Sequence, residues 1–458
     1  MKPISVETLC TIINGTHIHG PSIAIHFGAY RLKQVKQRNT VLFIEKHIMN
    51  WAKLAPYYPL VLVTESHYRT QELPSEVAII HVQHTEEALW KFINFYRGQF
   101  QLPVVAITGT AGKTTTKEMI KHILMRYKKV TATQLSTNSR TAFFHYLLSI
   151  ESDTEAAVFE TAVGAPGDLR RAGKYFKPTI GIITNIGEHH LNYCKTLEGY
   201  IDAKAEMLEI VDANGVLIIN ADDPNTSKID FEKFKGRLIK IGTKNSADYI
   251  ATNIRYSTTG MEFVIVHKGE YHKIGVTGFG KHQVMNALAA IVAVVEMGLT
   301  IPQAAEQLQT FRPLNKQLQL FEGMNGVLLL DDTWSITTTS LEAALIVLNE
   351  LAGTKKRIAI IGTITDVGPW GTFIHKKAAE IVLDKGVDVL ITVGEHAKII
   401  ANHALALGIQ AQVYCFNNSV LAYELLKNRI DSNTIILIKG DMYSKTMFDL
   451  ATKLKKKT

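Results

Sequence analysis

A glycine-rich loop between an apolar segment and a helical pattern is the strongest chemical feature of the sequence. It reads Gly-Thr-Ala-Gly-Lys-Thr, from Gly109 to Thr114, directly after the apolar stretch that ends at Ile107. The common nucleotide loop carries four residues between its glycines, whereas this one carries two. Backbone N–H groups and the helix dipole would face a phosphate there, Lys113 would reach the outer phosphates and the Thr114 hydroxyl would bind Mg²⁺. The pattern predicts a phosphate site, and the alternative is a glycine turn with an exposed lysine.

Two further polar groups follow apolar segments of the same kind. Glu160 directly follows residues 156–159, and the pair His189-His190 comes shortly after a segment that leads into Asn185. Taken singly, a glutamate at a strand end is usually a solvated charge, and a histidine pair is more often structural than ligating. In an open parallel sheet, however, ligands bind beyond the carboxyl ends of the strands. We therefore expect Glu160, His190 and the glycine loop to converge on one crevice.

Apolar segments that alternate with polar turns and helical patterns place these residues in a parallel α/β sheet. Its predicted strands are residues 104–107, 156–159, 179–184 and 215–220. Over about residues 237–278 the pattern becomes alternating, with a hairpin signal at Lys268-Gly269, which predicts a small antiparallel excursion. An apolar helix over residues 285–297 then closes at Gly298, where a glycine cap is expected.

The length of 458 residues predicts about three domains. We place them at residues 1–101, 102–313 and 314–458. The first is a small mixed α/β domain, with strands near 39–44 and 59–64 and a helix over 85–96. The third alternates helices with strands at 327–330, 357–361, 387–393 and 434–438, which is typical of a Rossmann-like sheet. The predicted fold class is α/β, with three domains and a central P-loop sheet.

Composition limits the possible partners. With 46% hydrophobic and 20% charged residues, the chain is expected to fold into packed cores. No run of 18 uncharged apolar residues occurs, so we expect a cytoplasmic protein without a membrane span. The net charge of +8 suits anionic ligands, but scattered lysines and the absence of a nucleic-acid motif argue against nucleic acid. Three widely spaced cysteines predict neither a disulfide framework nor a four-cysteine metal site.

Five motifs, in order and spacing, carry a resemblance over nearly the whole chain. "ITGTAGKTTTKEM", "ETAVGAPGDL", "TNIGEHHL", "DAKAEML" and "GFGKHQVMNALAA" resemble the Mur ligase family. The resemblance implies that the short loop binds ATP with Mg²⁺, in the central domain, and that the N-terminal domain binds substrate. It implies a monomer that joins a small-molecule carboxylate to an amine in peptidoglycan-precursor synthesis. The nearest reaction is the addition of D-alanyl-D-alanine to a UDP-N-acetylmuramoyl-tripeptide.

The resemblance also implies roles for individual residues. Lys113 and Thr114 match the contacts to the γ-phosphate and Mg²⁺, with Glu160 a further metal ligand. The residues implied for nucleotide binding are Gly109, Thr110, Ala111, Gly112, Lys113, Thr114, Thr115, His282, Asn286 and Asp332. Those implied for substrate are Thr133 and Asn138. Those implied for catalysis are Lys113, Lys204 and His190, and those for metal are Thr114, Glu160, His190 and Lys204.

The roles assigned to Lys204 and His190 depend most on the resemblance. Without it, Lys204 would be taken for an exposed helical lysine. The family carries this lysine as a carbamate, which would turn a cation into an anion beside Mg²⁺. The metal-binding histidine matches His190 rather than His189, because the motif reads N-I-G-E-x-H-L.

The sequence departs from the family where substrates are read. The N-terminal uridine signature D-S-R is absent near "HFGAYRLKQV", and the stretch T-x-x-N-x-N-N becomes "TQLSTNS", which keeps only Thr133 and Asn138. An expected arginine that would contact ATP is Gln317. In the third domain "DDSYNANP" becomes "DDTWSITT", "GDMLELG" becomes "GTITDVG", and "KGSR" becomes "KGDM" at Lys439–Met442.

We interpret the chain as an ATP-dependent ligase that forms a C–N bond through an acyl phosphate. Two alternatives stay open. One is a paralogue that joins a different acid and amine, which the lost uridine signature favours. The other is a nucleotide-binding regulator without ligase activity, which Gln317 favours and the set of Lys113, Glu160, His190 and Lys204 opposes.

Overall fold

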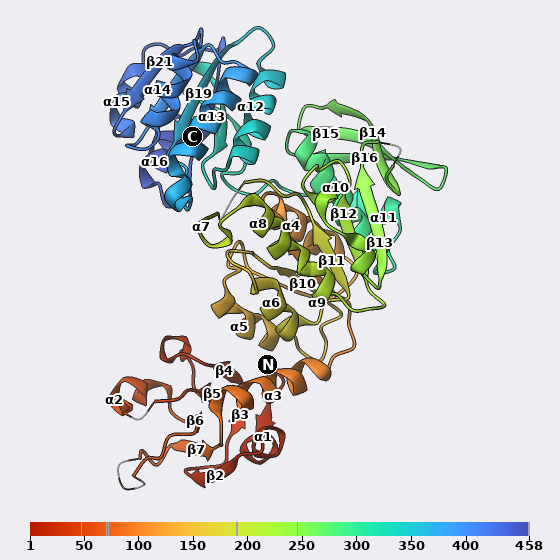
Figure 1. The fold of residues 1–458 in the computed structure, drawn as a ribbon, viewed down its shortest axis with the longest axis vertical. Coiled ribbons are helices and arrows are strands. Elements are labelled where there is room, and N and C mark those ends of the chain that lie inside the picture. Colours follow the sequence, from red (N-terminus) through yellow and green to blue (C-terminus); the bar gives the residue numbers. More distant parts are fainter. Residues whose placement is uncertain (47, 70, 72, 189–190, 245, 457–458) are drawn as a thin grey trace.

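The chain folds into three lobes stacked along its long axis (Figure 1). The computed structural model describes residues 1–46, 48–69, 71, 73–188, 191–244 and 246–456. Each lobe contains one large sheet made from a continuous part of the chain: five strands within residues 16–81, nine within 104–277 and six within 319–439. We name them the N-terminal, central and C-terminal lobes. The predicted α/β class is confirmed, and the domain boundaries at 101/102 and 313/314 stay a prediction.

The N-terminal lobe has the strand order β2-β7-β6-β5-β4. Its strands are β2 (Thr16–His19), β4 (Phe27–Ala29), β5 (Thr40–Phe43), β6 (Leu60–Thr64) and β7 (Val77–His81), beside a two-stranded pair of β1 (Ile4–Ser5) and β3 (Ala24–Ile25). Helix α1 (Val6–Ile13), capped by Ser5, packs beside α3 (Thr85–Gly98), which covers the predicted helix. Their apolar side chains share one buried cluster with α5 (Phe143–Leu148) and α6 (Asp168–Phe176) of the central lobe. The two lobes are therefore joined by a common core.

The central sheet has the order β16-β15-β14-β13-β12-β11-β8-β10-β9. Its parallel part consists of β8 (Val104–Thr108), β9 (Val130–Ala132), β10 (Ala156–Glu160), β11 (Ile180–Ile183), β12 (Val216–Asn220) and β13 (Arg237–Gly242). Strands β8, β10 and β11 are buried along their whole length, since the sheet is covered on both faces. Helices α4 (Lys113–Leu124) and α10 (Lys281–Val295) pack together on one face. Strand β8 thus lies between β11 and β10, and the three predicted strands end side by side.

The antiparallel excursion begins later than predicted. Strand β13 is parallel to β12, and only β14 (Tyr249–Tyr256), β15 (Gly260–His267) and β16 (Glu270–Thr277) form the antiparallel meander. Alternating apolar and polar residues mark a half-buried strand, whether it is parallel or antiparallel to its neighbour. The pattern therefore did not distinguish β13 from the antiparallel meander. The hairpin at Lys268-Gly269 is confirmed, with φ of 49° and 82°.

Helix α10 ends as predicted at a glycine. Gly298 has a φ of +94°, its N–H donates to the Val295 carbonyl, and the Leu299 N–H donates to the Val294 carbonyl. This pair of bonds is a Schellman motif, which needs a left-handed residue after the helix.

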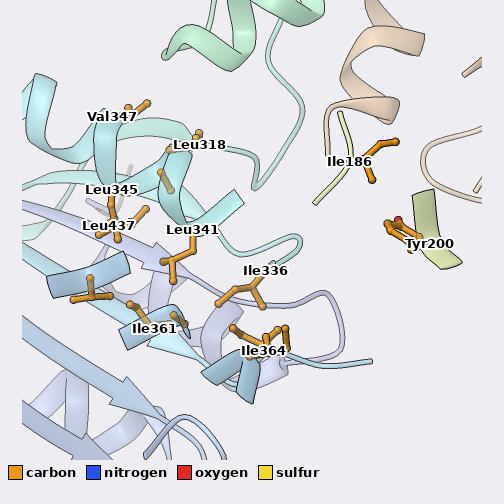
Figure 2. Close-up of a cluster of buried hydrophobic side chains, with 14 of the residues drawn as sticks. Ile186, Tyr200, Leu318, Ile336, Leu341, Leu345, Val347, Ile361, Ile364 and Leu437 are labelled. Carbon is orange, nitrogen blue, oxygen red and sulfur yellow. The ribbon is translucent and has the colours of Figure 1, made fainter. Parts of the chain in front are cut away.

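The C-terminal lobe has the order β17-β18-β22-β19-β20-β21. The strands are β17 (Gln319–Glu322), β18 (Leu328–Asp332), β19 (Lys356–Gly362), β20 (Val389–Val393), β21 (Gln412–Phe416) and β22 (Thr434–Lys439). The helices are α12 (Thr338–Ala352), α13 (Gly371–Lys385), α14 (Lys398–Ala406), α15 (Ser419–Leu426) and α16 (Lys445–Leu454). Figure 2 shows Leu341, Leu345, Ile361 and Leu437 of this lobe in one apolar cluster. No helix in the described part of the chain is long and apolar enough to cross a membrane.

Candidate active site

The glycine loop joins the end of β8 to the start of α4, as the sequence predicted. Gly112 precedes the first helical residue, Lys113, with a φ of +83°. A Cβ atom at Gly112 would lie 2.3 Å from Oδ1 of Asn286 on α10. The backbone thus needs glycine both for its left-handed conformation and for this close approach.

Two residues after β11 hold the loop in place, and sequence reasoning missed both. The Ala111 N–H donates to Oδ1 of Asn185 at 3.0 Å, and Asn185 Nδ2 donates to the Ala111 carbonyl at 2.9 Å. The Thr184 hydroxyl donates to the same carbonyl at 2.7 Å. Their position directly after a strand beside β8 was the available signal, since neighbouring parallel strands end at the same edge.

Lys113 folds back over the loop. Its Nζ donates to the Gly109 carbonyl at 2.9 Å and to the Thr110 carbonyl at 3.1 Å. Burial lowers the pKa of Lys113, and the negative charge of Glu160 partly opposes this shift. The ammonium therefore lies inside the site rather than in solvent, which contradicts the alternative of an exposed lysine.

Glu160 lies at the centre of a short chain of hydrogen bonds. The Thr114 hydroxyl donates to Oε2 of Glu160 at 2.8 Å, and Asn138 Nδ2 donates to Oε1 at 2.6 Å. The side chain is only 1% exposed, so the solvated strand-end charge is excluded. Thr133, predicted to contact substrate, is buried, and its hydroxyl accepts the Glu160 N–H at 3.1 Å.

Lys204 is fully buried on α8 (Leu197–Ala205), so it is not an exposed helical lysine. Its Nζ lies 3.4 Å from the hydroxyl of Thr108, the last residue of β8, and 4.5 Å from the centre of the Tyr200 ring. Burial and then the charge of Lys113 hold the pKa of Lys204 well below its usual range. The predicted metal ligand His190 lies outside the described residues, as does His189. Among the described residues, no group of three or more His, Cys, Asp or Glu side chains forms a metal cluster.

The predicted nucleotide contacts on α10 lie beside the loop. Asn286 is buried, and its Oδ1 lies 3.4 Å from the Thr116 hydroxyl. Burial, together with the charge of Lys439, lowers the pKa of His282 to about 4, so this imidazole is neutral at pH 7.

Two residues of the C-terminal lobe complete this edge of the site. Asp332, at the end of β18, forms an ion pair with Lys439 Nζ at 2.5 Å and accepts the Leu318 N–H at 3.2 Å. Sequence reasoning did not predict this pairing of Asp332. Gln317, at the position of the expected arginine, accepts a hydrogen bond from the Thr115 hydroxyl at 3.1 Å.

A cavity of about 1010 Å³ opens above the loop, between the central and C-terminal lobes. Residues from Thr110 to Thr115 line it, together with Asn138, Glu160, His282, Asn286 and Asp332. Thr133 and Lys204 are not among the described lining residues, and neither is any described residue of the N-terminal lobe. Backbone N–H groups at a helix start, an inward lysine and a hydroxyl–carboxylate pair together favour binding of a nucleotide phosphate with a divalent cation.

Two family models match the chain. The Mur ligase middle domain matches residues 107–294, and the glutamate ligase domain of the Mur ligases matches residues 318–442. The first match contains the glycine loop, and the second contains most of the C-terminal wall of the cavity.

Curated proteins and solved structures agree with these matches. The chain is 28% identical over 367 residues to UDP-N-acetylmuramoyl-tripeptide--D-alanyl-D-alanine ligase of Bacillus subtilis (strain 168), covering 80% of this chain and 79% of the relative. It is 27% identical over 323 residues to the enzyme of the same name from Escherichia coli (strain K12), covering 70% and 71%. MurF from Acinetobacter baumannii shares the fold, with a TM-score of 0.85 at 23% identity over 99% of this chain and 100% of that one. MurF of Thermotoga maritima in complex with ADP aligns with a TM-score of 0.78 at 18% identity, over 93% and 97%.

Proposed function

The chain belongs to the Mur ligase family, and from this we propose that it is an ATP-dependent ligase that joins a carboxylic acid to an amine. The nearest activity is that of its relatives, UDP-N-acetylmuramoyl-tripeptide--D-alanyl-D-alanine ligase, in cytoplasmic synthesis of peptidoglycan precursors. The single observation that carries the proposal is the loop from Gly109 to Thr114, tied to Glu160 and opening on the cavity between two lobes.

The loop would bind the phosphates of ATP. Backbone N–H groups at the start of α4 and the positive end of its dipole favour an anion. Lys113 already lies over the loop, and its Nζ would exchange the carbonyls of Gly109 and Thr110 for phosphate oxygens. His282 and Asn286, which also line the cavity, would contact the adenine. A neutral His282 suits that role, because one nitrogen of a neutral imidazole donates a hydrogen bond while the other accepts one.

The oxygen atoms beside the loop fit Mg²⁺. The Thr114 hydroxyl and the Glu160 carboxylate are hard oxygen donors that lie 2.8 Å apart, and Asn138 fixes the second carboxylate oxygen. We assign Thr114 and Glu160 as protein ligands, with His190 as a further ligand. Bound Mg²⁺ would supply positive charge to the phosphate oxygens.

Lys204 fits the carbamate that the family pattern implies. A buried amine with a lowered pKa is uncharged more often than a surface lysine, and only the uncharged amine attacks CO₂. A new bond from Nζ to carbon and the loss of one proton would give an anion in place of a cation. That anion would lie on the same side of the site as Lys113, whose charge would favour it.

The proposed reaction has two transfers. A carboxylate oxygen of the acid attacks the γ-phosphorus, the bond to the β-phosphate breaks, and ADP and an acyl phosphate form. The amine nitrogen then attacks the acyl carbon, loses a proton and expels phosphate. Lys113 stabilises the charge that develops on the transferring phosphoryl group, which is the main source of rate in such reactions.

Contacts between the central and C-terminal lobes support exclusion of water, which would hydrolyse an acyl phosphate. Lys377 on α13 of the C-terminal lobe forms an ion pair with Glu188 of the central lobe at 2.6 Å. Gln317 and Thr115 make a second contact at the cavity itself. Together they hold the two walls near each other.

Phosphate release that needs both substrates tests the proposal. The protein would be incubated with ATP, Mg²⁺, a panel of carboxylates that includes UDP-N-acetylmuramoyl-tripeptide, and a panel of amino acids and dipeptides. A ligase releases phosphate only when an acid and an amine are both present, and the joined product appears by mass spectrometry. Release without either substrate would indicate a simple ATPase, and nucleotide binding without release would indicate a regulator.

The same panel separates the two remaining candidates. A paralogue would ligate an acid other than the UDP-linked tripeptide, and the missing uridine signature favours it. A regulator is favoured only by Gln317, because the amide brings no positive charge to the phosphates.

A further inference from the structure

The cavity wall contributed by the C-terminal lobe carries a carboxylate that the reaction above does not use. Asp441 follows β22, and its neighbour Thr365 follows β19, the next strand in the sheet. Both residues line the cavity, at the edge where the carboxyl ends of parallel strands meet. This wall faces the ATP loop across the cavity, which is where the second substrate would enter.

Two neutral groups hold the Asp441 carboxylate. The Thr365 hydroxyl donates to Oδ2 at 2.9 Å, and the Tyr443 N–H donates to Oδ1 at 2.9 Å. No cationic side chain among the described residues forms an ion pair with Asp441, although the residue is only 8% exposed. A buried carboxylate fixed by two donors but not neutralised favours a cation and disfavours a second anion.

The other charges of this wall do not offset Asp441. Lys439 lies two residues earlier, but its Nζ is bound to Asp332 at 2.5 Å and to the Ser335 carbonyl at 2.8 Å. The described lining residues from the C-terminal lobe contain no arginine, and Met442 stands where the family pattern has one. A ligand carboxylate at this wall would therefore meet Asp441 without a free cation of the described C-terminal lining residues to pair with.

The geometry points to Asp441 as the residue that selects the amine substrate. Resting on the proposed ligase function, the inference is that the enzyme prefers a cationic amine without a free carboxylate, such as an amino-acid or dipeptide amide. Asp441 accepts hydrogen bonds from the ammonium of that substrate on entry and repels a carboxylate at the other end.

A matched pair of amines tests this choice. With ATP, Mg²⁺ and the acid that gives most product, kcat/KM is measured for D-alanyl-D-alanine and for its C-terminal amide. We expect the amide to be favoured about tenfold or more, the equivalent of ~1.4 kcal/mol. Asp441→Asn should reduce this preference to about threefold or less, mainly through KM for the free acid. Asp449→Asn, on the exposed side of α16, should leave the ratio unchanged.

The outcomes separate the inference from the function on which it rests. Equal or better use of the free dipeptide by the unmodified enzyme would overturn the role of Asp441, while the ligase function would stand. An unchanged preference in a folded Asp441→Asn protein would also overturn it. No ligation with any acid and amine would overturn the proposed function and this inference with it. The unmodified enzyme decides the main point even if Asp441→Asn does not fold.

Discussion

Two lysines, the partly buried Lys113 and the fully buried Lys204, define the chemistry at the scale of single residues. Both have lowered pKa values, and the charge of Lys113 contributes to the shift of Lys204. Two cations held near each other with restricted access to water are unfavourable unless anions join them. ATP phosphates at Lys113 and a carbamate at Lys204 would supply that negative charge.

Lys113→Ala should abolish ATP-dependent ligation while the fold stays intact. Loss of one preorganised cation at a transferring phosphoryl group costs on the order of 3 kcal/mol, or a hundredfold in rate. Phosphate release in the presence of both substrates measures the effect, and Lys121→Ala on the outer part of α4 is the control. More than about a tenth of the original rate in Lys113→Ala would refute the ATP-loop assignment.

Lys204→Ala should be nearly inactive and partly restored by acetate. A small carboxylate can occupy the space of the missing carbamate and return its negative charge, whereas it cannot replace an ammonium. Activity with and without acetate is measured, together with the carbon-13 spectrum of the unmodified protein in labelled bicarbonate. Full activity without acetate, or the absence of a carbamate signal, would leave Lys204 a structural residue.

His282 should make stability depend on pH. Its folded pKa is about 4 and an unfolded histidine titrates near 6.5, so the unfolded state binds a proton more readily. The neutral His282 therefore makes its full contribution to the free energy of unfolding above pH 6.5. That contribution is lost as the pH falls from 6.5 to 4, and the loss is about 2 kcal/mol at pH 5. Calorimetric melting of the protein and of His282→Gln at pH 7.5 and pH 5 checks this. An equally large fall in melting temperature in both proteins would show that His282 is not responsible.

At the scale of elements, the loop and α4 depend on one backbone conformation. Gly112 and Gly167 both precede helices with a positive φ, of 83° and 88°. A Cβ atom at Gly112 would meet Asn286, but at Gly167 it would meet nothing within 4 Å. Gly112→Ala and Gly167→Ala should each lose about 1 kcal/mol of stability from strain alone, but only Gly112→Ala should weaken ATP binding. Melting and ATP titration of both variants test this, and equal ATP affinity would contradict the close packing of loop and helix.

The sequence was informative about elements and much less about which elements are neighbours. The apolar runs that end at Ile107 and Phe159 correctly predicted β8 and β10, because strands buried on both faces are apolar throughout and do not alternate with polar residues. The support that Asn185 gives the loop depends on β11 pairing with β8, which no local pattern states. The burial of Lys204 likewise depends on what packs over α8, so its own helix suggested an exposed residue.

At the scale of the whole molecule, the N-terminal lobe contacts the central lobe through residues 26–35, the segment where a uridine signature was expected. A Cβ atom at Gly28 would lie 2.6 Å from Cδ1 of Leu148. The Tyr30 hydroxyl donates to the Arg140 carbonyl at 3.3 Å, and Gln34 donates to the Thr141 carbonyl at 2.8 Å. These polar groups join two lobes, so they are not free to bind a ligand.

Weak binding of UDP-linked substrates follows from this arrangement. No described residue of the N-terminal lobe lines the cavity, and Arg31 lies beside the Tyr30 ring, 5.7 Å from its centre. Arginine is the side chain suited to bidentate phosphate contacts, and uracil needs donors and acceptors in fixed positions. Each unpaired polar group costs about 1–3 kcal/mol, so two lost partners would weaken binding by roughly two to four orders of magnitude at ~1.4 kcal/mol per tenfold.

Calorimetric titration with UDP-N-acetylmuramoyl-tripeptide measures this affinity, and UDP alone shows whether the uridine diphosphate part contributes. We expect little or no heat with UDP, because the D-S-R signature is absent near Phe27–Arg31 and Arg31 has no aspartate or serine beside it. ATP serves as the positive control, since Lys113, Thr114 and Glu160 are all in place at the loop proposed to bind it. A dissociation constant in the low micromolar range or tighter for the tripeptide would contradict the expectation. Such tight binding would mean that other residues of the N-terminal lobe supply the binding energy for the UDP part. It would therefore favour the peptidoglycan reaction of the relatives over a paralogue that uses a different acid.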